Sequence, residues 1–286
     1  MTELRQRMIE AMVVRGFAQR TQDAYVDAIR RMAKHYRRDP AGYTAQQVQD
    51  YLMHMVREQG LSYSTMNQAA CAARFLFETV LGHSRQDFLV PMAKVAQRQP
   101  ELLGRQEIAR LLLACEQPRQ RMLLQTVYAA GLRVSEVCAL ELRDIDSATD
   151  RMCIRVRAGK GGHDRHSILS PTLLGLLREH VRCFRPQRWL FSNAKDSQPI
   201  SVESAQRAYQ RARQNARIIK RGGIHSLRHG FATHLLEGGV DLYTISQLLG
   251  HGHISTTARY LHLVSPQFRP PQGVDPLDLL AGLYMT

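Results

Sequence analysis

The stretch HSLRHGFATHLLE, residues 225–237, has the pattern of an amphipathic helix with a polar pair on one face. His225 and Arg228 are three positions apart, so on a helix they project from the same side. Apolar residues recur at four-residue intervals on the other side, at Leu227, Phe231 and Leu235. This spacing predicts a helix that packs its apolar face on a core and turns His225 and Arg228 toward a cleft.

Two further polar residues follow this helix. His251 comes directly after the residues LLG (248–250), where Gly250 predicts the C-terminal cap of a helix. Tyr260 stands nine residues further along the chain, on a short segment for which Ser255 is the expected N-cap. The pattern therefore predicts two more helices, at residues 242–249 and 255–261.

Two basic residues precede the helix in contexts that suit a functional role. Arg133 lies in GLRVSE (131–136), where Glu136, one helical turn later, is placed to orient the arginine. Lys160 lies among glycines in the turn GKGG (159–162), and glycine lets a turn adopt positive φ and approach a ligand closely. A lysine at such a tip can reach into the minor groove of DNA and protonate a 5′-oxygen leaving group.

These residue types together can break a phosphodiester bond without a metal ion. The reaction needs a nucleophile, stabilisation of charge on the non-bridging oxygens, and a proton for the leaving oxygen. The forked guanidinium groups of Arg133 and Arg228 suit the second task. A phenol has a pKa of about 10, so Tyr260 as nucleophile needs cationic neighbours and a proton acceptor. We expect His225 to be the acid/base partner and His251 to donate a hydrogen bond to the phosphate.

We assign no chemistry to four further histidines or to the five cysteines. A lone histidine on a helix is usually structural, and this interpretation applies to His229, His234, His253 and His262. The cysteines are odd in number, lack metal-ligand spacing and lie among apolar residues, at positions 71, 115, 138, 153 and 183. They are predicted to be small buried hydrophobes in a reducing compartment. Neither a metal nor a cofactor is expected.

The order and spacing of these motifs resemble the tyrosine site-specific recombinases, the family of Xer recombinases, phage integrases and integron integrases. The resemblance rests on GLRVSE, the GKG turn, HSLRHGFATHL, LLGH and TTARY, and extends to about residue 264. It implies catalytic roles for six residues, with Tyr260 as nucleophile: Arg133, Lys160, His225, Arg228, His251 and Tyr260. Glu136 is implied to support Arg133.

The resemblance also implies a fold and a reaction. Two domains would clamp double-stranded DNA at a recombination site, and tyrosine attack would form a 3′-phosphotyrosine link. The freed 5′-hydroxyl then attacks the link on a partner duplex. Four identical subunits would exchange strands in two steps through a Holliday junction, without ATP or metal. Because the covalent link stores the phosphodiester energy, no nucleotide-binding loop is needed.

Composition agrees with a nucleic-acid partner. The net charge is +14, and 34 of the 39 basic residues are arginine. The first hundred residues hold 14 basic and 9 acidic side chains, and the remainder is basic as well, so both parts are expected to face one polyanion. No stretch approaches the ~20 apolar residues of a membrane span. With no signal-peptide pattern either, the expected location is the cytoplasm, without a membrane partner.

The fold class expected is mainly α with a small antiparallel β-sheet in the C-terminal domain. A helical core-binding (SAM-like) domain is expected over residues 1–95 and a linker over 96–104. The catalytic domain is expected over residues 105–264. Residues 265–286 are expected to form a proline-containing tail with a C-terminal helix for exchange between subunits.

Hydrophobic periodicity predicts the elements of each domain. Helices of the first domain are expected at residues 4–14, 21–36, 44–55 and 62–80, with a capping box at Thr44. Strands of the second domain are expected near residues 152–156 and 165–169. Its helices are expected near residues 106–115, 119–129, 171–182, 202–216, 225–237, 242–249 and 255–261. The helices at 62–80 and 202–218 are the expected DNA contacts.

Departures from the family pattern favour a recombinase of a mobile element or prophage, which integrates or excises DNA. An extra arm-binding domain is not expected, and residues 191–222 are too few for the helix inserted in integron integrases. The prolines at 266, 270 and 271 make the tail unlike the short basic tails expected of Xer proteins. Xer-like resolution of chromosome or plasmid dimers is the alternative. The leucines of the tail are expected to dock on a neighbouring subunit: Leu277, Leu279, Leu280 and Leu283.

Three rival functions are weighed against recombination. A type IB topoisomerase shares the tyrosine and arginine chemistry, but the small helical N-terminal domain argues against it. A metal-dependent rolling-circle nuclease would use His251 and His253 as ligands, yet Gly252 separates them where an apolar strand residue is needed. The third rival, a DNA-binding protein without catalytic activity, would be expected to have lost some of the catalytic set.

The sequence leaves open the target site, the direction of recombination and the involvement of accessory proteins.

Overall fold

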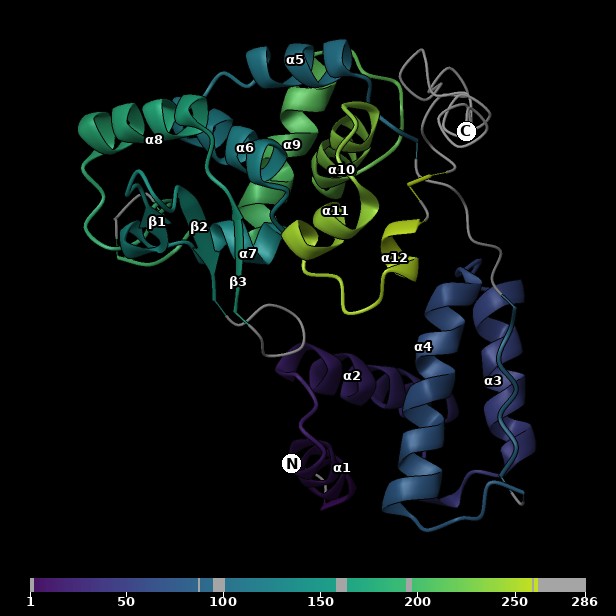
Figure 1. The fold of residues 1–286 in the computed structure, drawn as a ribbon. Helices are drawn as coiled ribbons and strands as arrows, with labels where there is room; N and C mark the ends of the chain where they lie inside the picture. Colours follow the sequence, from purple (N-terminus) through teal and green to yellow (C-terminus); the bar gives the residue numbers. More distant parts are fainter. Residues whose placement is uncertain are drawn as a thin grey trace, which may run out of the picture. The chain divides into compact units, whose positions relative to one another are not determined.

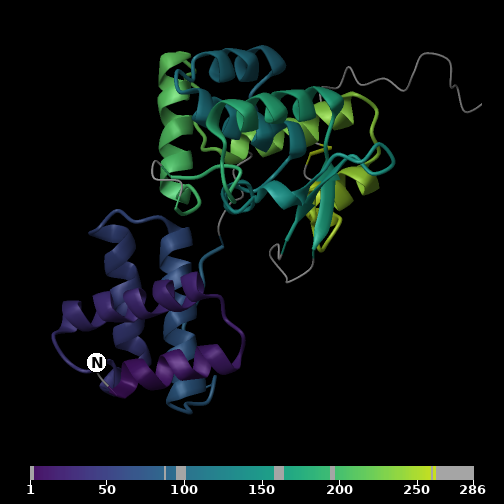
Figure 2. The same cartoon turned by 90° about the vertical axis from the view of Figure 1, so that its left-hand side faces the viewer.

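The computed structural model describes residues 3–86, 88–94, 101–157, 164–193, 197–258 and 260–261. The chain divides into two units, Met1–Arg98 and Gln99–Thr286, each with its own hydrophobic core (Figures 1 and 2). Three predicted features lie outside the described residues: Lys160 and its turn, most of the linker, and the tail with its helix at 275–283.

The first unit is a bundle of helices. Its described part contains α1 (Glu3–Val14), α2 (Gln19–Tyr36), η1 (Pro40–Gly42), α3 (Ala45–Arg57), α4 (Tyr63–Arg74) and η2 (Phe75–Val80). The segment η2 is π-helical, so the helix predicted over 62–80 changes its winding at Phe75. The predicted capping box is present, because the Thr44 hydroxyl accepts from the Gln47 amide and the Gln47 side chain accepts from the Thr44 amide.

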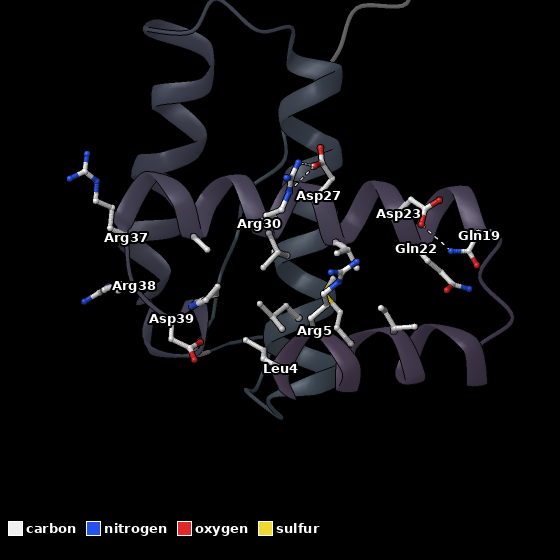
Figure 3. Close-up of a pocket in the computed structure, with 17 residues that line it drawn as sticks. Leu4, Arg5, Gln19, Gln22, Asp23, Asp27, Arg30, Arg37, Arg38 and Asp39 are labelled. Atoms are coloured by element: carbon white, nitrogen blue, oxygen red, sulfur yellow. Dashed lines mark hydrogen bonds and ion pairs between the residues drawn. The ribbon is translucent and has the colours of Figure 1, made fainter. Parts of the chain in front are cut away.

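A cavity of about 1010 Å³ lies between α1 and α2. Apolar side chains such as Met8 line it together with charged residues of α2. Figure 3 shows Arg30 directed at Asp27, and Gln19 at Asp23, along that helix. This cavity belongs to the first unit, whereas the described residues that are predicted as catalytic all belong to the second.

The second unit holds a small antiparallel sheet, as predicted. Its strands are β1 (Ile145–Asp146), β2 (Cys153–Val156) and β3 (Arg165–Ile168), in the order β1-β2-β3. In the register of the predicted hairpin, Ile154 pairs with Ser167 and Val156 with Arg165. Ile154 and Val156 are buried while Arg155 between them is exposed, which is the period of two expected of a strand covered on one face. The two-residue strand β1 was not predicted.

The sheet lies at one edge of the second unit (Figure 1), whose described helices are α5 (Arg105–Leu113), α6 (Pro118–Ala130), α7 (Val134–Cys138), η3 (Leu142–Asp144), α8 (Pro171–Phe184), α9 (Val202–Asn215), α10 (His225–Glu237), α11 (Leu242–Leu249) and α12 (Ser255–Ala258). The core helix α6 packs against α5, α8, α9 and α10, with Leu123, Leu124 and Val127 fully buried. None of the helices in the described ranges is long and apolar enough to cross a membrane.

Two helix ends that shape the site are closed by glycine. Gly131 ends α6 with φ +60°, and Gly250 ends α11 with φ +62°, as the sequence predicted for Gly250. Both glycines also make room for neighbours. A Cβ would lie 2.4 Å from the Phe231 ring at Gly131 and 2.4 Å from the Arg165 side chain at Gly250. Glycine is therefore required at both positions by backbone conformation and by space.

Three expectations about the second unit need correction. The helix α7 was not predicted, because five residues give too little periodicity to recognise. The last helix, α12, is shorter than expected, and Ser255 is its first residue rather than its cap. The carbonyl of Ile254 accepts from the amides of Thr257 and Ala258, so Ile254 occupies the cap position.

The expectation that all the cysteines are buried is wrong. Cys115 and Cys138 are buried, Cys71 and Cys153 are partly buried, and Cys183 is exposed. Cys183 lies in the last turn of α8, which presents one face to solvent there. An apolar sequence neighbourhood therefore did not predict its exposure.

We expect Gly131→Ala to destabilise the second unit. Backbone strain of about 1 kcal/mol and overpacking against Phe231 of about 1–3 kcal/mol predict a loss of roughly 2–4 kcal/mol in the free energy of unfolding. Urea denaturation followed by the fluorescence of Trp189, the single tryptophan, would report on this unit. Gly239→Ala is the control, since Gly239 has φ +87° and no atom within 4 Å of a Cβ. Equal losses in both variants would contradict the packing argument.

Candidate active site

The carboxylate of Glu136 is the central anion of the candidate site. Glu136 is buried, with 8 % of its surface exposed. Its Oε1 and Oε2 accept hydrogen bonds from Nη1 and Nη2 of Arg165 at 2.8 and 2.9 Å, which is a forked pairing. The Arg133 side chain donates to Oε1 at 2.7 Å and the Arg133 amide to Oε2 at 2.7 Å. The predicted Arg133–Glu136 contact is thus present, and Arg165 shares the same carboxylate.

These contacts keep Glu136 ionised. Burial alone would raise the pKa of its carboxyl group. Hydrogen bonds and positive charge from Arg165, together with hydrogen bonds from Arg133, outweigh burial and lower the pKa from 4.5 to about 2. At neutral pH the site therefore contains one fixed buried negative charge among several guanidinium groups.

The last turn of α11 engages three arginines through three consecutive carbonyls. The Leu248 carbonyl accepts from Arg165 at 3.0 Å, and the Leu249 carbonyl accepts from Arg228 at 2.6 Å. The Gly250 carbonyl accepts from Arg133 at 3.2 Å. Carbonyls at a helix C-terminus lack partners within the helix and carry partial negative charge, so they suit cationic donors. This turn therefore sets the positions of the arginines relative to one another.

Arg228 is buried, with 4 % of its surface exposed. Besides its bond to Leu249, it donates to the carbonyl of Gly131 at 2.7 Å. Burial and the neighbouring charge of Arg133 lower its pKa to about 10, so it stays charged at neutral pH. The expectation that His225 and Arg228 face the cleft together is only partly met, because the carbonyls of helix ends draw Arg228 inward while His225 stays exposed.

His225 begins α10 beside the arginines. The pKa of its imidazole is lowered by desolvation and then by the positive charges of Arg228 and Arg133, although the residue keeps an exposed surface. The imidazole is therefore favoured in its neutral form at neutral pH. In that form one ring nitrogen can accept a proton.

His251 follows Gly250 and lies against Arg228. Its Nε2 is 3.3 Å from Nη2 of Arg228, and its Nδ1 is 2.7 Å from the hydroxyl of Thr257. A guanidinium group has no acceptor, so a hydrogen bond from Arg228 to Nε2 places the ring proton on Nδ1. Donation from Nε2 to a phosphate, as predicted, requires that this nitrogen take up a proton.

Tyr260 is held in the interior by helices α10 and α11. It is 2 % exposed and belongs to an apolar cluster with Phe231 and Leu249. Its hydroxyl is 2.9 Å from Nδ1 of His229. His229 was interpreted as structural from the sequence, so its contact with the predicted nucleophile is a new feature of the site.

Sequence reasoning missed two residues, His229 and Arg165. His229 has a recognisable signal, since it directly follows Arg228 in the HSLRH motif. Arg165 is separated from Glu136 by 29 positions, and its signal is weaker. It is the first residue of β3. Hydrogen bonds and an ion pair bring together four described residues of the predicted set: Arg133, Glu136, Arg228 and His251. His225 interacts electrostatically with Arg133 and Arg228, and Tyr260 interacts electrostatically with Arg228.

The comparisons with known proteins identify the family. Residues 101–265 match the model of the phage integrase family, and residues 4–87 match the phage integrase N-terminal SAM-like domain. An integrase/recombinase of Sinorhizobium fredii is 38% identical over 93% of this chain and 86% of its own length. Tyrosine recombinase XerA of Thermococcus kodakarensis is 34% identical over 78% of each chain.

Solved structures agree at the level of the fold. A lambda integrase dimer bound to a core site has a TM-score of 0.72 and 19% identity, covering 95% of this chain and 79% of that one. The Tn1549 transposon integrase in complex with a circular intermediate DNA has a TM-score of 0.71 and 16% identity, covering 90% and 94%.

The family match and the named relatives show that this mainly helical protein is an enzyme that cleaves and rejoins DNA. The chain belongs to the phage integrase family, the tyrosine recombinases. The resemblance predicted from its motifs is confirmed. This membership favours recombination over the rolling-circle nuclease and the silent DNA-binding protein.

We expect Glu136→Gln to lose stability in a pH-dependent way. The carboxyl group has a pKa of about 2 when folded and an ordinary value of 4.5. Its stabilising contribution is therefore complete above pH 4.5 and declines as the pH falls toward 2, with a full size of roughly 3 kcal/mol. Urea denaturation followed by Trp189 fluorescence should show this gap at pH 7 and a smaller gap below pH 4.5.

The matched control for this measurement is Glu179→Gln on α8. The Glu179 carboxylate is exposed, and its ion pair with Arg182 is long, at 4.0 Å. That change should leave the free energy of unfolding nearly unaltered at both pH values. A gap for Glu136→Gln that is independent of pH would mean that side-chain shape, rather than charge, is responsible.

Proposed function

We propose that this enzyme recombines double-stranded DNA at specific sites through a 3′-phosphotyrosine link to Tyr260. The observation that carries the proposal is the arginine network at the end of α11. It holds Arg133 and Arg228 next to His251 in a chain of the tyrosine recombinase family. No metal or nucleotide cofactor takes part in the proposed reaction.

Each predicted residue has a proposed role in the step. Arg133, whose side chain is 22% exposed, and Arg228 stabilise negative charge on the scissile phosphate. His225 serves as an acid/base partner, which its lowered pKa suits. His251 donates to the phosphate once its Nε2 is protonated, a state that an anionic ligand favours. Lys160 protonates the 5′-oxygen as it leaves.

Glu136 supports these groups without touching the substrate. Its carboxylate holds Arg133 through both the backbone and the side chain, so the guanidinium keeps one orientation. Fixed orientation matters because catalytic donors must already point at the developing charge before the reaction begins.

We propose that helix α9 contributes to DNA contact, together with the segment 62–80 of the first unit. Arg207 and Arg211 lie one turn apart on α9, and both are exposed. Arginines in such a row suit the phosphate backbone of a duplex. The net charge of +14 supports the same partner.

For the biological role we propose integration and excision of a mobile element or prophage, acting on cytoplasmic DNA. The relative named integrase/recombinase, at 38% identity, supports it. Xer-like resolution of chromosome or plasmid dimers is the second candidate, which the 34% identity to a XerA recombinase favours. Recombination between two directly repeated sites on one plasmid measures resolution, and capture of a separate circle measures integration. The ratio of the two yields would separate the two roles.

The proposed reaction is tested by covalent trapping in EDTA on a nicked duplex from the DNA flanking the gene. The wild-type protein should form an adduct that resists SDS, and Tyr260→Phe should form none, because a phenyl ring cannot attack phosphorus. Tyr243→Phe is the matched control, since Tyr243 is 64% exposed on α11 and should leave the adduct yield unchanged. An adduct that persists in Tyr260→Phe, or that needs a metal ion, would contradict the proposal.

We propose further that a homotetramer assembles on DNA and that the leucines of the tail dock on a neighbouring subunit. Removing residues 274–286 should then abolish cooperative binding to DNA with two sites, while binding to a single site survives. Gel-shift titrations on one-site and two-site duplexes measure both quantities. Undiminished cooperativity in the truncated protein would exclude a role for the tail in assembly.

A further inference from the structure

The pairing of Tyr260 with His229 has no role in the mechanism above. The Tyr260 hydroxyl is 2.9 Å from Nδ1 of His229, and the two rings are 5.7 Å apart between centroids. Tyr260 is 2 % exposed, so its hydroxyl meets protein rather than bulk water. A buried phenol needs a polar partner, and here that partner is a group able to take its proton.

A positive charge close to the pair can stabilise the phenolate that forms when Tyr260 reacts. Arg228 precedes His229 on α10, and its positive charge interacts with Tyr260. A guanidinium close to a developing phenolate stabilises it most where water is excluded. Among the described residues, Tyr128 of α6 packs on the same apolar cluster as Tyr260, and His251, after α11, contacts Arg228.

The other two histidines of the site are engaged differently. His251 directs Nδ1 at the hydroxyl of Thr257 and Nε2 at Arg228. His225 is exposed and interacts electrostatically with Arg228 and Arg133, the two residues proposed to bind phosphate. The Tyr260 hydroxyl lies within hydrogen-bond distance of Nδ1 of His229, at 2.9 Å.

We propose that His229, in place of His225, is the catalytic residue that accepts the phenolic proton of Tyr260 when the tyrosine attacks DNA. The inference rests on the proposed function, in which Tyr260 is the nucleophile. As the Oη–P bond forms and the P–O5′ bond breaks, the phenolic proton passes to Nδ1 of His229. The 5′-oxygen receives a different proton, from the leaving-group acid.

The same residue then serves the rejoining step. When a 5′-hydroxyl attacks the phosphotyrosine, the P–Oη bond breaks and the Tyr260 oxygen leaves. The imidazolium of His229 returns its proton to that oxygen, which restores both groups to their starting states. Cleavage and rejoining are the reverse of each other, so one group must act as base in the first and acid in the second.

The experiment measures single-turnover adduct formation on the nicked duplex for wild type, His229→Ala and His229→Asn, between pH 6 and 9.5. At pH 7 both variants should be slower by roughly 100- to 10,000-fold, the range typical of a lost general base. The deficit should shrink as the pH rises, because hydroxide then ionises the phenol. Added imidazole should restore part of the rate of His229→Ala, since it can enter the space left by the ring.

His229→Asn separates proton transfer from positioning. Its amide places a hydrogen-bonding atom close to the site of Nδ1 but cannot accept a proton at these pH values. A wild-type rate for His229→Asn, or a deficit that is independent of pH and unaffected by imidazole, would overturn the proposal. Single-site DNA binding by His229→Asn should equal that of wild type, which shows that the variant is folded.

Failure of this inference is distinguishable from failure of the proposed function. If wild type forms an adduct that Tyr260→Phe lacks, Tyr260 is the nucleophile whatever the His229 variants do. If His229→Ala then cleaves as fast as wild type, only the role of His229 is wrong. If wild type itself forms no adduct that depends on Tyr260, the proposed function and the inference that rests on it both fail.

Discussion

The arrangement of the arginines in the second unit depends on one buried carboxylate, that of Glu136. Glu136 accepts hydrogen bonds from Arg133 and Arg165, and a nitrogen of Arg228 lies 3.7 Å away. Three guanidinium groups so close together repel one another, and burial makes the repulsion stronger. A single anion with a pKa of about 2 offsets it at every physiological pH. The fold can therefore hold several guanidinium groups close together, because Glu136 offsets the repulsion among them.

Carbonyl groups at the ends of α6 and α11 also hold the arginines in place. The carbonyls of Gly131, Leu249 and Gly250 accept from Arg228 and Arg133. These carbonyls would otherwise lack partners, and the arginines would otherwise be buried without acceptors, so each set satisfies the other. The two arginines proposed to bind the phosphate are thus part of the fold as well as of the proposed chemistry. A substitution at either would affect both stability and activity.

Local patterns in the sequence predicted much of this structure, and the long-range pairings escaped them. The bounds of α10 and α11 follow from apolar periodicity and from the Gly250 cap, and the Arg133–Glu136 contact follows from a spacing of three. The His229–Tyr260 pair joins residues 31 positions apart, and only the packing of α10 on the segment after α11 brings them together. The two-residue strand β1 has too few positions for any period to appear.

The turn formed by Leu248, Leu249 and Gly250 has a consequence for how the gene can vary. Each of its carbonyls serves a different arginine: Arg165, Arg228 and Arg133. Adding or removing one residue within α11 would rotate that turn by about 100° and shift it by about 1.5 Å along the axis. All three acceptors would then miss their donors at once. Insertions and deletions should accordingly be confined to surface loops and excluded from α11, even where single substitutions on its exposed face are tolerated.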